Sequence, residues 1–380
     1  MKKLLWGILF IFALLPGTVT VYAEKADLKL FSEAAILVDT DTGAVLYEKN
    51  SQQKMYPASL TKIATAIYAI EKGNLEDMVT ASWNAVTEEG SRVYLMKDET
   101  MPLKQLIQGM MVNSGNDAST AIAEHLHGSE EEFSKKINKY LRNQIGVQNT
   151  HFVNAHGLFD ENHYTTAADL AAITNYAMKN PVFREIFGIK YLPWEAEAWK
   201  TTLVTHHKLL KGEIPFQWEI TGGKTGFVNQ SRHTLATTAE SGDIRLTAIV
   251  LKADVKNHMY EDTMKLLEYG FTNYRTTVIP KGQEFEKDGK VYTVDQDVAV
   301  TEDIRGMTAE VGENGQLEIR NSENKVIQTV PLKPVEQNAL SADSDELPGI
   351  LSMNTVLLML AIMAVTGYVS FKRRMRNKSV

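Results

Sequence analysis

The chain alternates apolar runs with short polar turns in two places, and this pattern predicts paired strands. Residues 34–38 and 44–47 are apolar, and Asp39-Thr40-Asp41-Thr42-Gly43 separates them. Strand, turn and strand in this order are typical of an antiparallel hairpin. Residues 234–239 and 244–251 repeat the pattern across a Ser-Gly-Asp turn. The sequence therefore predicts two pairs of antiparallel strands that lie far apart along the chain.

Between these strand pairs the apolar positions recur with the spacing of helices. Ser129 and Thr166 are placed to cap two of them, because a side-chain hydroxyl can accept a hydrogen bond from a free N–H group at a helix start. Asn180-Pro181 ends the second of these helices. Helices and antiparallel strands in one chain predict an α/β fold of the α+β type. The predicted helices cover residues 60–70, 103–127 on both sides of Ser114, 130–141, 167–179 and 261–270.

Beyond Tyr274 the pattern of apolar and polar positions changes, and it predicts short strands of alternating character separated by turn residues. We interpret residues 278–335 as a small, separate all-β domain that follows the main domain at 24–277. Residues 336–348 are polar, acidic and poor in aromatic side chains, as expected of a solvated linker.

Both ends of the chain carry apolar segments. Residues 1–23 combine a basic start, a short apolar run and small residues, which is typical of a secretory signal peptide, with an uncleaved membrane anchor as the alternative. Residues 349–371 contain no charged side chain, and a helix of that length reaches about 34 Å, enough to cross a bilayer. Five basic residues follow in the tail at 372–380. The positive-inside rule places this tail in the cytoplasm and the main domain outside the cell membrane.

Composition narrows the class of protein. There is no cysteine, so disulfides cannot stabilise an exported domain, and the stability must come from a buried core. The formal net charge is −7 and there is no basic stripe, which argues against nucleic acid as a partner.

The first candidate for chemistry is the pair Ser59 and Lys62. A serine followed three residues later by a lysine at a helix start places both side chains on one face, with the serine at the positive end of the helix dipole. Ser51 and Lys54 have the same spacing, but they lie in a polar stretch with no apolar helix behind it. Ser59 opens an apolar helix after Pro57, so we predict that Ser59 is the nucleophile. Taken alone, this pair would favour a capping serine and a surface lysine.

Two further polar clusters follow in order. Ser114-Gly115-Asn116 lies between two predicted helices, where a loop can direct a hydroxyl and an amide into a cleft, although a simple turn is the alternative. Lys224-Thr225-Gly226 occurs once and precedes a strand-like region, where a lysine and a hydroxyl could bind a carboxylate. The preceding Gly222-Gly223 also favours a β-turn there. The three clusters in this order form the signature of serine β-lactamases and penicillin-binding proteins.

Other catalytic classes fit less well. The nine histidines show no His-Glu-x-x-His spacing, so we predict no metal and no cofactor. A Gly-x-Ser-x-Gly motif of a Ser-His-Asp hydrolase is also absent from the sequence. His156 and His163 are predicted to organise a loop.

The chain resembles the D-alanyl-D-alanine carboxypeptidases among the low-molecular-mass penicillin-binding proteins, over nearly its whole length. The resemblance implies a penicillin-binding-protein or β-lactamase-like domain with an antiparallel sheet and a helical cluster, a small β domain and a C-terminal anchor. The segments that carry it are Pro57-Ala58-Ser59-Leu60-Thr61-Lys62, Asn113-Ser114-Gly115-Asn116-Asp117-Ala118, Asn154-Ala155-His156-Gly157-Leu158 and His163-Tyr164-Thr165-Thr166-Ala167-Ala168-Asp169-Leu170.

The sequence departs from this family at two places. Gly222-Gly223 stands where the family usually has an Asp-Gly-hydrophobic run, and Ser231-Arg232-His233 stands where an Ala-Gly pair is common. Both departures bear on the shape of the pocket and on substrate preference more than on the reaction.

The resemblance implies hydrolysis of a peptidoglycan stem peptide through an acyl-enzyme, and acylation by β-lactam antibiotics. Lys62, kept partly neutral by burial and by Lys224, would take the proton of Ser59. Ser114 would pass the proton to the leaving D-alanine. The resemblance places the oxyanion hole at the backbone N–H groups of Ser59 and Phe227. The expected substrate-binding residues are Asn116, Lys224, Thr225 and Gly226.

Two alternatives remain open from the sequence. A class A-like β-lactamase would need a glutamate that activates the deacylating water, and no Glu-x-x-Leu-Asn pattern lies between Asn116 and Lys224. A non-catalytic penicillin sensor would need a cytoplasmic signalling part, and only the short tail after Phe371 is available for it.

Overall fold

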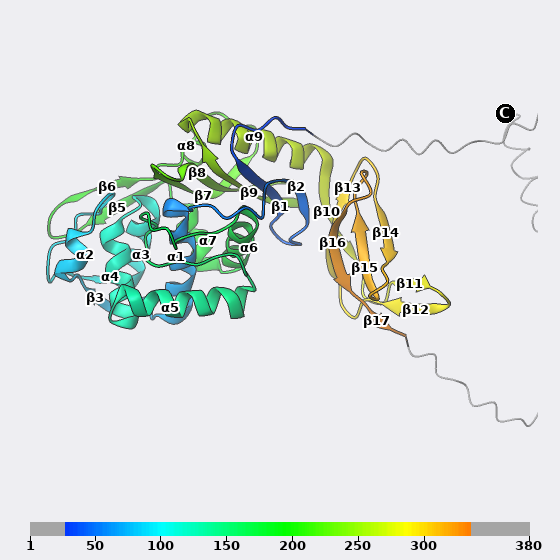
Figure 1. The fold of residues 1–380 in the computed structure, drawn as a ribbon, viewed down its shortest axis with the longest axis horizontal. Helices are drawn as coiled ribbons and strands as arrows, with labels where there is room; N and C mark the ends of the chain where they lie inside the picture. The colour runs from blue at the N-terminus through cyan, green and yellow to red at the C-terminus, as the bar shows by residue number, and fades with distance from the viewer. Residues whose placement is uncertain (1–26, 336–380) are drawn as a thin grey trace, which may run out of the picture. The chain divides into compact units, whose positions relative to one another are not determined.

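A five-stranded antiparallel sheet forms the centre of the fold. The computed structural model describes residues 27–335. The strand order is β2-β1-β9-β8-β7, so both predicted strand pairs belong to one sheet, with β1 beside β9. The two pairs are therefore far apart in sequence but adjacent in space (Figure 1). The strands are β1 (Ala34–Asp39), β2 (Val45–Lys49), β7 (Glu219–Val228), β8 (Arg232–Ser241) and β9 (Ile244–Ala253).

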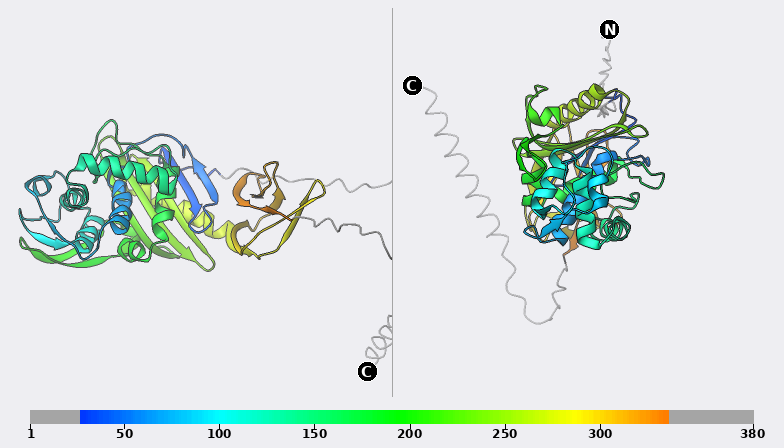
Figure 2. Two further views of the ribbon diagram at one scale, coloured as in Figure 1. Left: turned by 90° about the horizontal axis from the view of Figure 1, so that it is seen from below. Right: turned by 90° about the vertical axis from the view of Figure 1, so that its left-hand side faces the viewer.

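The two faces of this sheet are covered by different helices. Side chains alternate along a strand, so Ile36 and Val38 of β1 pack into one core with the helical cluster, whereas Leu37 packs into another core with α9. Figures 1 and 2 show the sheet between these two layers. The helices are η1 (Ala58–Leu60), α1 (Thr61–Lys72), α2 (Trp83–Thr87), α3 (Leu103–Val112), α4 (Asn116–His127), α5 (Glu130–Tyr140), η2 (Leu141–Ile145), α6 (Ala167–Met178), α7 (Pro181–Phe187), α8 (Lys208–Lys211) and α9 (Lys256–Asn273).

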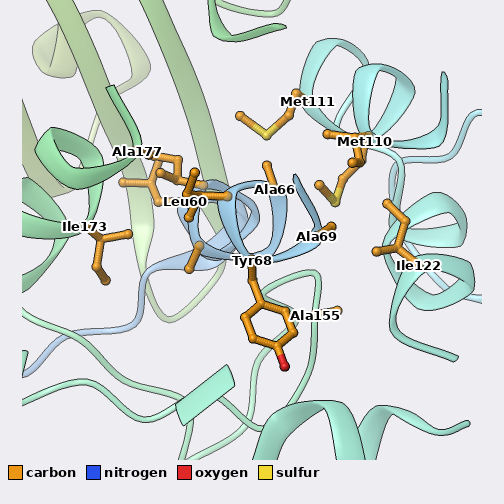
Figure 3. Packing of buried hydrophobic residues seen from close by; sticks show 14 of the residues in the cluster. Leu60, Ala66, Tyr68, Ala69, Met110, Met111, Ile122, Ala155, Ile173 and Ala177 are labelled. Atoms are coloured by element: carbon orange, nitrogen blue, oxygen red, sulfur yellow. The ribbon is translucent and has the colours of Figure 1, made fainter. Parts of the chain in front are cut away.

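Helix α1 runs through the middle of the helical cluster. Every residue of α1 from Thr61 to Ala69 is buried. Alanines at 64, 66 and 69 leave room for neighbouring side chains, and Met110 and Met111 of α3, Ile122 of α4 and Ile173 of α6 surround the helix (Figure 3). Because α1 is surrounded on every side, the lysine in its first turn has no route to bulk solvent, and its side chain is 0% exposed.

The last strands of the described chain form small antiparallel sheets. The predicted boundary between the main domain and the small β domain, at residue 278, falls inside strand β10 (Tyr274–Ile279). That residues 278–335 form a separate domain stays a prediction. Asp39, in the predicted turn, accepts hydrogen bonds from Thr276 of β10 and Thr301 of β13, at 2.7 and 2.8 Å. The remaining strands are β3 (Met78–Thr80), β4 (Thr100–Pro102), β5 (Tyr191–Glu195), β6 (Lys200–Val204), β11 (Glu284–Lys287), β12 (Lys290–Thr293), β13 (Val298–Asp303), β14 (Thr308–Val311), β15 (Gln316–Arg320), β16 (Val326–Pro331) and β17 (Lys333–Pro334).

Several sequence predictions about these elements are confirmed. Ser129 and Thr166 cap α5 and α6, because their hydroxyls accept hydrogen bonds from the N–H groups of Glu132 and Asp169. The helical region around Ser114 is two helices with residues 113–115 between them.

Other predictions were wrong in detail. Gly222-Gly223 is not a turn, since it lies inside β7 beside a bulge between Ile220 and Gly222. The closing helix α9 begins five residues before the predicted start at 261 and ends three residues after 270. Helix α6 ends before Asn180-Pro181 as predicted, and the structure adds a further helix, α7, which begins at Pro181 and is capped by Asn180.

Within residues 27–335, none of the helices has the length and apolar character to cross a bilayer. The predicted signal peptide, linker, transmembrane helix and basic tail all lie outside the described residues.

Candidate active site

Ser59 lies in the tight turn η1, two residues before the start of α1 at Thr61. The turn is tied on both sides. Thr234 of β8 donates to the carbonyl of Pro57 at 3.1 Å, and Thr61 donates to the carbonyl of Ala58 at 2.8 Å. Ala58 has a φ of +49°, a left-handed conformation that is strained for a residue with a side chain. The surrounding contacts hold this strained turn and thereby present the serine.

Gly157 allows its own loop to pack closely against this turn. Its φ is +92°, and a Cβ atom at this position would lie 1.9 Å from the carbonyl oxygen of Ala58. A side chain is therefore incompatible both with the backbone conformation and with the close approach. The glycine brings the neighbouring carbonyl of His156 to the catalytic lysine.

Lys62 is buried and has three polar partners. Its Nζ donates to Asn116 Oδ1 and to the backbone carbonyl of His156, both at 2.7 Å, and lies 3.2 Å from Ser59 Oγ. Burial lowers the pKa of Lys62 well below its usual 10.5, and the charge of Lys224 lowers it further. The lysine is thus positioned to accept a proton from the serine at neutral pH.

Ser114 and Lys224 form the opposite wall of the site. Lys224 Nζ donates to Ser114 Oγ at 3.0 Å and to the carbonyl of Thr225 at 2.8 Å. Ser114 has a φ of +61°, so the loop between α3 and α4 directs its hydroxyl towards β7. Burial lowers the pKa of Lys224 to about 7. Both lysines of the site therefore release a proton far more easily than an exposed lysine does.

The side chain of Asn116 joins Lys62 to the backbone of Glu89. Its Oδ1 accepts the hydrogen bond from Lys62, and its Nδ2 donates to the carbonyl of Glu89 at 2.5 Å. The amide is oriented by these two bonds, since only the nitrogen can donate to a carbonyl. Gly90 lies against it, because a Cβ atom there would be 2.8 Å from Asn116 Nδ2.

Strand β7 lies at the edge of the sheet and passes the nucleophile at Gly226. A Cβ atom at Gly226 would lie 2.4 Å from Thr234 Oγ1 and 3.0 Å from the backbone nitrogen of Ser59. The first departure from the family pattern, Gly222-Gly223, has a physical reason in the same strand. Cβ atoms at Gly222 and Gly223 would lie 2.4 Å from the ring of Phe187 and 2.3 Å from that of His207. These glycines make room for two buried rings.

The second departure shapes the rim of the cleft. His233 of β8 pairs with Phe227 of β7, and their rings lie tilted by 37° with centroids 4.7 Å apart. Arg232 has a φ of +51° in the tight turn before it. The imidazole thus occupies the place beside the strand where a smaller residue would leave open space.

His163 supports the site from behind and does not face the cleft. Its Nδ1 accepts a hydrogen bond from the N–H of Val153 at 3.2 Å, so Nε2 carries the proton and donates to Thr61 Oγ1 at 2.8 Å. Burial lowers the pKa of His163 to about 3. The neutral ring therefore fixes the loop to the nucleophile turn, as its predicted organising role requires.

A cleft of 390 Å³ opens above the nucleophile. Ser59, Ser114, Thr225, Gly226 and Phe227 all line it, so it joins the three sequence clusters at one place. His233 also lines it, in the segment whose departure from the family pattern was expected to affect the shape of the pocket. Sequence reasoning missed the other walls, for which the chain carries no local signal. These are Ser91, His206, Lys256 and Met259.

The arrangement excludes the rival motif and bears on the alternatives. Ser51 is buried, and its hydroxyl donates to Glu48 at 2.6 Å, which is a structural role. Within residues 27–335, no aspartate or glutamate lines the cleft, whereas a class A-like β-lactamase would need a carboxylate beside the nucleophile. Ser59 beside the buried Lys62, with Ser114 beside Lys224, is the arrangement that characterises a serine acyl-transfer enzyme of the penicillin-binding-protein class.

Comparison with known proteins agrees with this class. Residues 20–255 match the D-alanyl-D-alanine carboxypeptidase family. The chain is 34% identical over 288 residues to D-alanyl-D-alanine carboxypeptidase DacF of Bacillus subtilis, covering 73% of this chain and 72% of that protein. It is 29% identical to DacA of Escherichia coli over 299 residues, covering 71% and 70%.

Solved structures give the same result. The chain superposes on penicillin-binding protein 5 of Haemophilus influenzae with a TM-score of 0.70 and 26% identity, covering 82% of this chain and 98% of that one. The chain belongs to the D-alanyl-D-alanine carboxypeptidase family. It is a serine-type carboxypeptidase, a hydrolase.

Proposed function

We propose that the protein removes the terminal D-alanine from peptidoglycan stem pentapeptides through a covalent ester on Ser59. The observation that carries this proposal is the 3.2 Å contact between Ser59 Oγ and the Nζ of the buried Lys62. A serine hydroxyl is a weak nucleophile unless a base takes its proton as it attacks. Lys62 supplies this base because burial and Lys224 favour its neutral form.

The proposed first step is acylation. Lys62 takes the proton of Ser59, and Oγ attacks the carbonyl carbon of the penultimate D-alanine. The peptide bond to the terminal D-alanine breaks, and its nitrogen leaves with a proton that Ser114 passes on. Ser114 can be resupplied because its hydroxyl lies 3.0 Å from Lys224 Nζ. In the second step water attacks the ester carbonyl carbon, and the bond to Ser59 Oγ breaks as Lys62 returns its proton to Oγ. The proton that the water loses restores Lys224 through Ser114, and the shortened peptide leaves with a new carboxylate.

The remaining predicted residues bind and polarise the substrate. Lys224 and Thr225 would hold the terminal carboxylate, and Asn116 would orient both Lys62 and the substrate amide. The backbone N–H groups of Ser59 and Phe227 would form the oxyanion hole, where one donor stabilises the transition state by about 3 kcal/mol. Gly226 leaves the space for the peptide to approach Ser59, since a side chain there would crowd its nitrogen.

The same site would react with β-lactam antibiotics. Their strained amide is attacked by Ser59 in the same way, and the ring-opened product stays attached as an acyl-enzyme. We therefore propose stem peptides and β-lactams as the partners of this cleft.

The decisive experiment incubates the full-length protein with a stem pentapeptide and follows the products by mass spectrometry. We expect a tetrapeptide and free D-alanine, and an acyl-enzyme on Ser59 after treatment with a fluorescent penicillin. Ser59→Ala should abolish both. Ser51→Ala is the matched control, because Ser51 has the same serine–lysine spacing but bonds to Glu48. Labelling that survives Ser59→Ala and disappears in Ser51→Ala would overturn the assignment.

We also propose that the protein is held at the cell membrane by residues 349–371, with the catalytic part outside. Only the sequence supports this proposal, through the uncharged apolar run and the basic residues after it. Truncation before Gly349 should release a soluble, active enzyme. A truncated protein that stays on the membrane would point instead to an uncleaved segment at 1–23, and a soluble but inactive one would give the anchor a structural role.

A further inference from the structure

Lys62 becomes positively charged during acylation, and its direct partners carry no charge. When it takes the proton of Ser59 it becomes a buried ammonium ion, bonded to a hydroxyl, an amide oxygen and a backbone carbonyl. A buried ion without a counter-charge is costly. The structure therefore raises the question of which groups stabilise the charged form.

Two carboxylates lie directly behind the carbonyl that Lys62 binds. Glu88 follows α2 and Glu130 begins α5, and both face the side chain of His156. Nε2 of His156 lies 3.6 Å from Glu88 Oε2 and 3.4 Å from Glu130 Oε1. Thr120 of α4 contacts the same two oxygens, at 3.1 and 3.5 Å. We call Glu88, Glu130 and His156 the carboxylate–imidazole cluster.

The hydrogen bonds fix the orientation of this imidazole. Nδ1 of His156 accepts a hydrogen bond from the N–H of Leu158 at 3.1 Å, so Nε2 carries the proton and points at the two carboxylates. The N–H of Ala155 also donates to Glu130 Oε1, at 3.2 Å. Although burial raises the pKa of Glu130, the bond to His156 and the other donors lower it overall, which keeps this carboxylate ionised. With its proton on Nε2, the ring is a donor in the cluster and not a ligand for a metal ion.

We propose that Glu88 and Glu130 are positioning residues of the acylation step. Through the His156 side chain they hold the backbone carbonyl that accepts the hydrogen bond from Lys62, and they supply the counter-charge for the ammonium ion formed there. This inference rests on the proposed role of Lys62 as the base that activates Ser59.

Charged and titratable groups act on Lys62 from several elements packed around α1. Lys224 of β7 acts against its ammonium form, and Asp117 of α4 acts for it, together with the two glutamates. His163 lies on the loop behind the nucleophile turn and is neutral. Asp117 is unsuitable for a test, since its carboxylate accepts hydrogen bonds from the backbone of Val93 and Leu95 and holds that loop.

The test replaces each carboxylate by an amide of the same shape. Glu130→Gln and Glu88→Gln keep an oxygen that accepts from His156 or Thr120 but remove the negative charge. The acylation rate of the full-length protein with a fluorescent penicillin is measured against pH, where it should rise as Lys62 loses its proton. Without one carboxylate the ammonium form is less stable. The rising limb should then move to lower pH by roughly one unit, with a lower plateau at high pH.

Two further variants test whether the shift comes from the lost negative charge. Glu131→Gln is the matched control, because it lies next to Glu130 on α5 with a side chain 79% exposed and pairs with Lys135. Its pH profile should coincide with that of the wild type. Glu130→Asp keeps the charge and shortens the side chain, so the limb should stay near the wild-type pH even if the plateau falls.

A purely structural role predicts a different profile. Looser packing of the loop would lower the rate by the same factor at every pH, and an unmoved limb in both Gln variants overturns the proposal. A limb that moves to higher pH overturns it too. If Glu130→Gln does not fold, Glu88→Gln decides alone. Failure of the proposed function is separable, because a limb that persists in Lys62→Ala would show that Lys62 is not the base.

Discussion

Replacing Gly157 by alanine should damage both the stability and the chemistry of the enzyme. The new Cβ atom would lie 1.9 Å from the carbonyl oxygen and 2.4 Å from the carbonyl carbon of Ala58, and both are backbone atoms that cannot rotate away. The turn carrying Ser59 or the loop carrying His156 must therefore move. Either movement separates the His156 carbonyl from Lys62 Nζ, which lie 2.7 Å apart in the native site.

The structure supplies a matched control for this change. Gly146 has the same φ of +92°, but a Cβ atom there would meet nothing within 4 Å. Gly146→Ala should cost only the left-handed backbone strain, about 1–2 kcal/mol. Gly157→Ala adds an overpacking cost of about 1–3 kcal/mol, so its total is about 2–5 kcal/mol. At about 2 °C per kcal/mol for a chain of this size, we expect Tm to fall by roughly 2–4 °C in the control and 4–10 °C in Gly157→Ala.

Two measurements check this reasoning. Thermal unfolding gives the two Tm values, and the rate of labelling by a fluorescent penicillin reports the state of the nucleophile. We expect Gly146→Ala to label at the wild-type rate and Gly157→Ala to label at least tenfold more slowly, because a small misplacement of reacting groups costs about 10²-fold. Equal Tm losses together with normal labelling in both variants would refute the argument.

Three further predictions concern the two lysines. Lys62→Ala should slow acylation by about 10²–10⁴-fold in a stopped-flow labelling assay, and a wild-type rate would show that the base is wrong. Lys224→Arg keeps the charge but changes the geometry, so KM for a substrate with a free carboxylate should rise by about 10–100-fold, more than for an amidated analogue. Burial lowers the pKa of Lys224 from 10.5 to about 7, so between these pH values the unfolded chain holds a proton that the folded protein has released. The free energy of unfolding should therefore rise with pH through this window, and urea titrations should show a smaller rise for Lys224→Met; parallel pH curves would contradict the lowered pKa.

The elements that could be predicted from the sequence are those with strong local signals. The hairpin at Asp39 and the helices capped by Ser129 and Thr166 were recognisable because turn chemistry and helix caps depend on neighbouring residues. The glycine pair at 222 and 223 favoured a β-turn as the alternative for the same reason, and the structure places it inside β7. Its purpose is to admit Phe187 and His207, which approach from other elements.

The residues of the site also divide into those with a local sequence motif and those that only the packing of distant segments brings together. The serine, both lysines and the asparagine could be chosen from three short motifs, and Ser59 could be separated from Ser51 by the apolar helix that follows it. Glu88, Glu130 and the carbonyl of His156 could not be chosen, since they belong to three segments with no common motif. Their relation to Lys62 exists only because α4, α5 and the loop before α6 pack around the first turn of α1.

The amino-acid sequence by itself determined which groups can react and the order in which they occur, because hydroxyl, amine and amide chemistry is a property of each residue. It also determined the apolar helix that places Lys62 one turn after Ser59. Only the tertiary structure decided how those groups behave. The low pKa of Lys62 arises from its complete burial and from Lys224, which is 162 positions later in the chain. Burial and charge proximity are set by packing between distant segments, so neither the lowered pKa of Lys62 nor its counter-charges can be derived from local spacing.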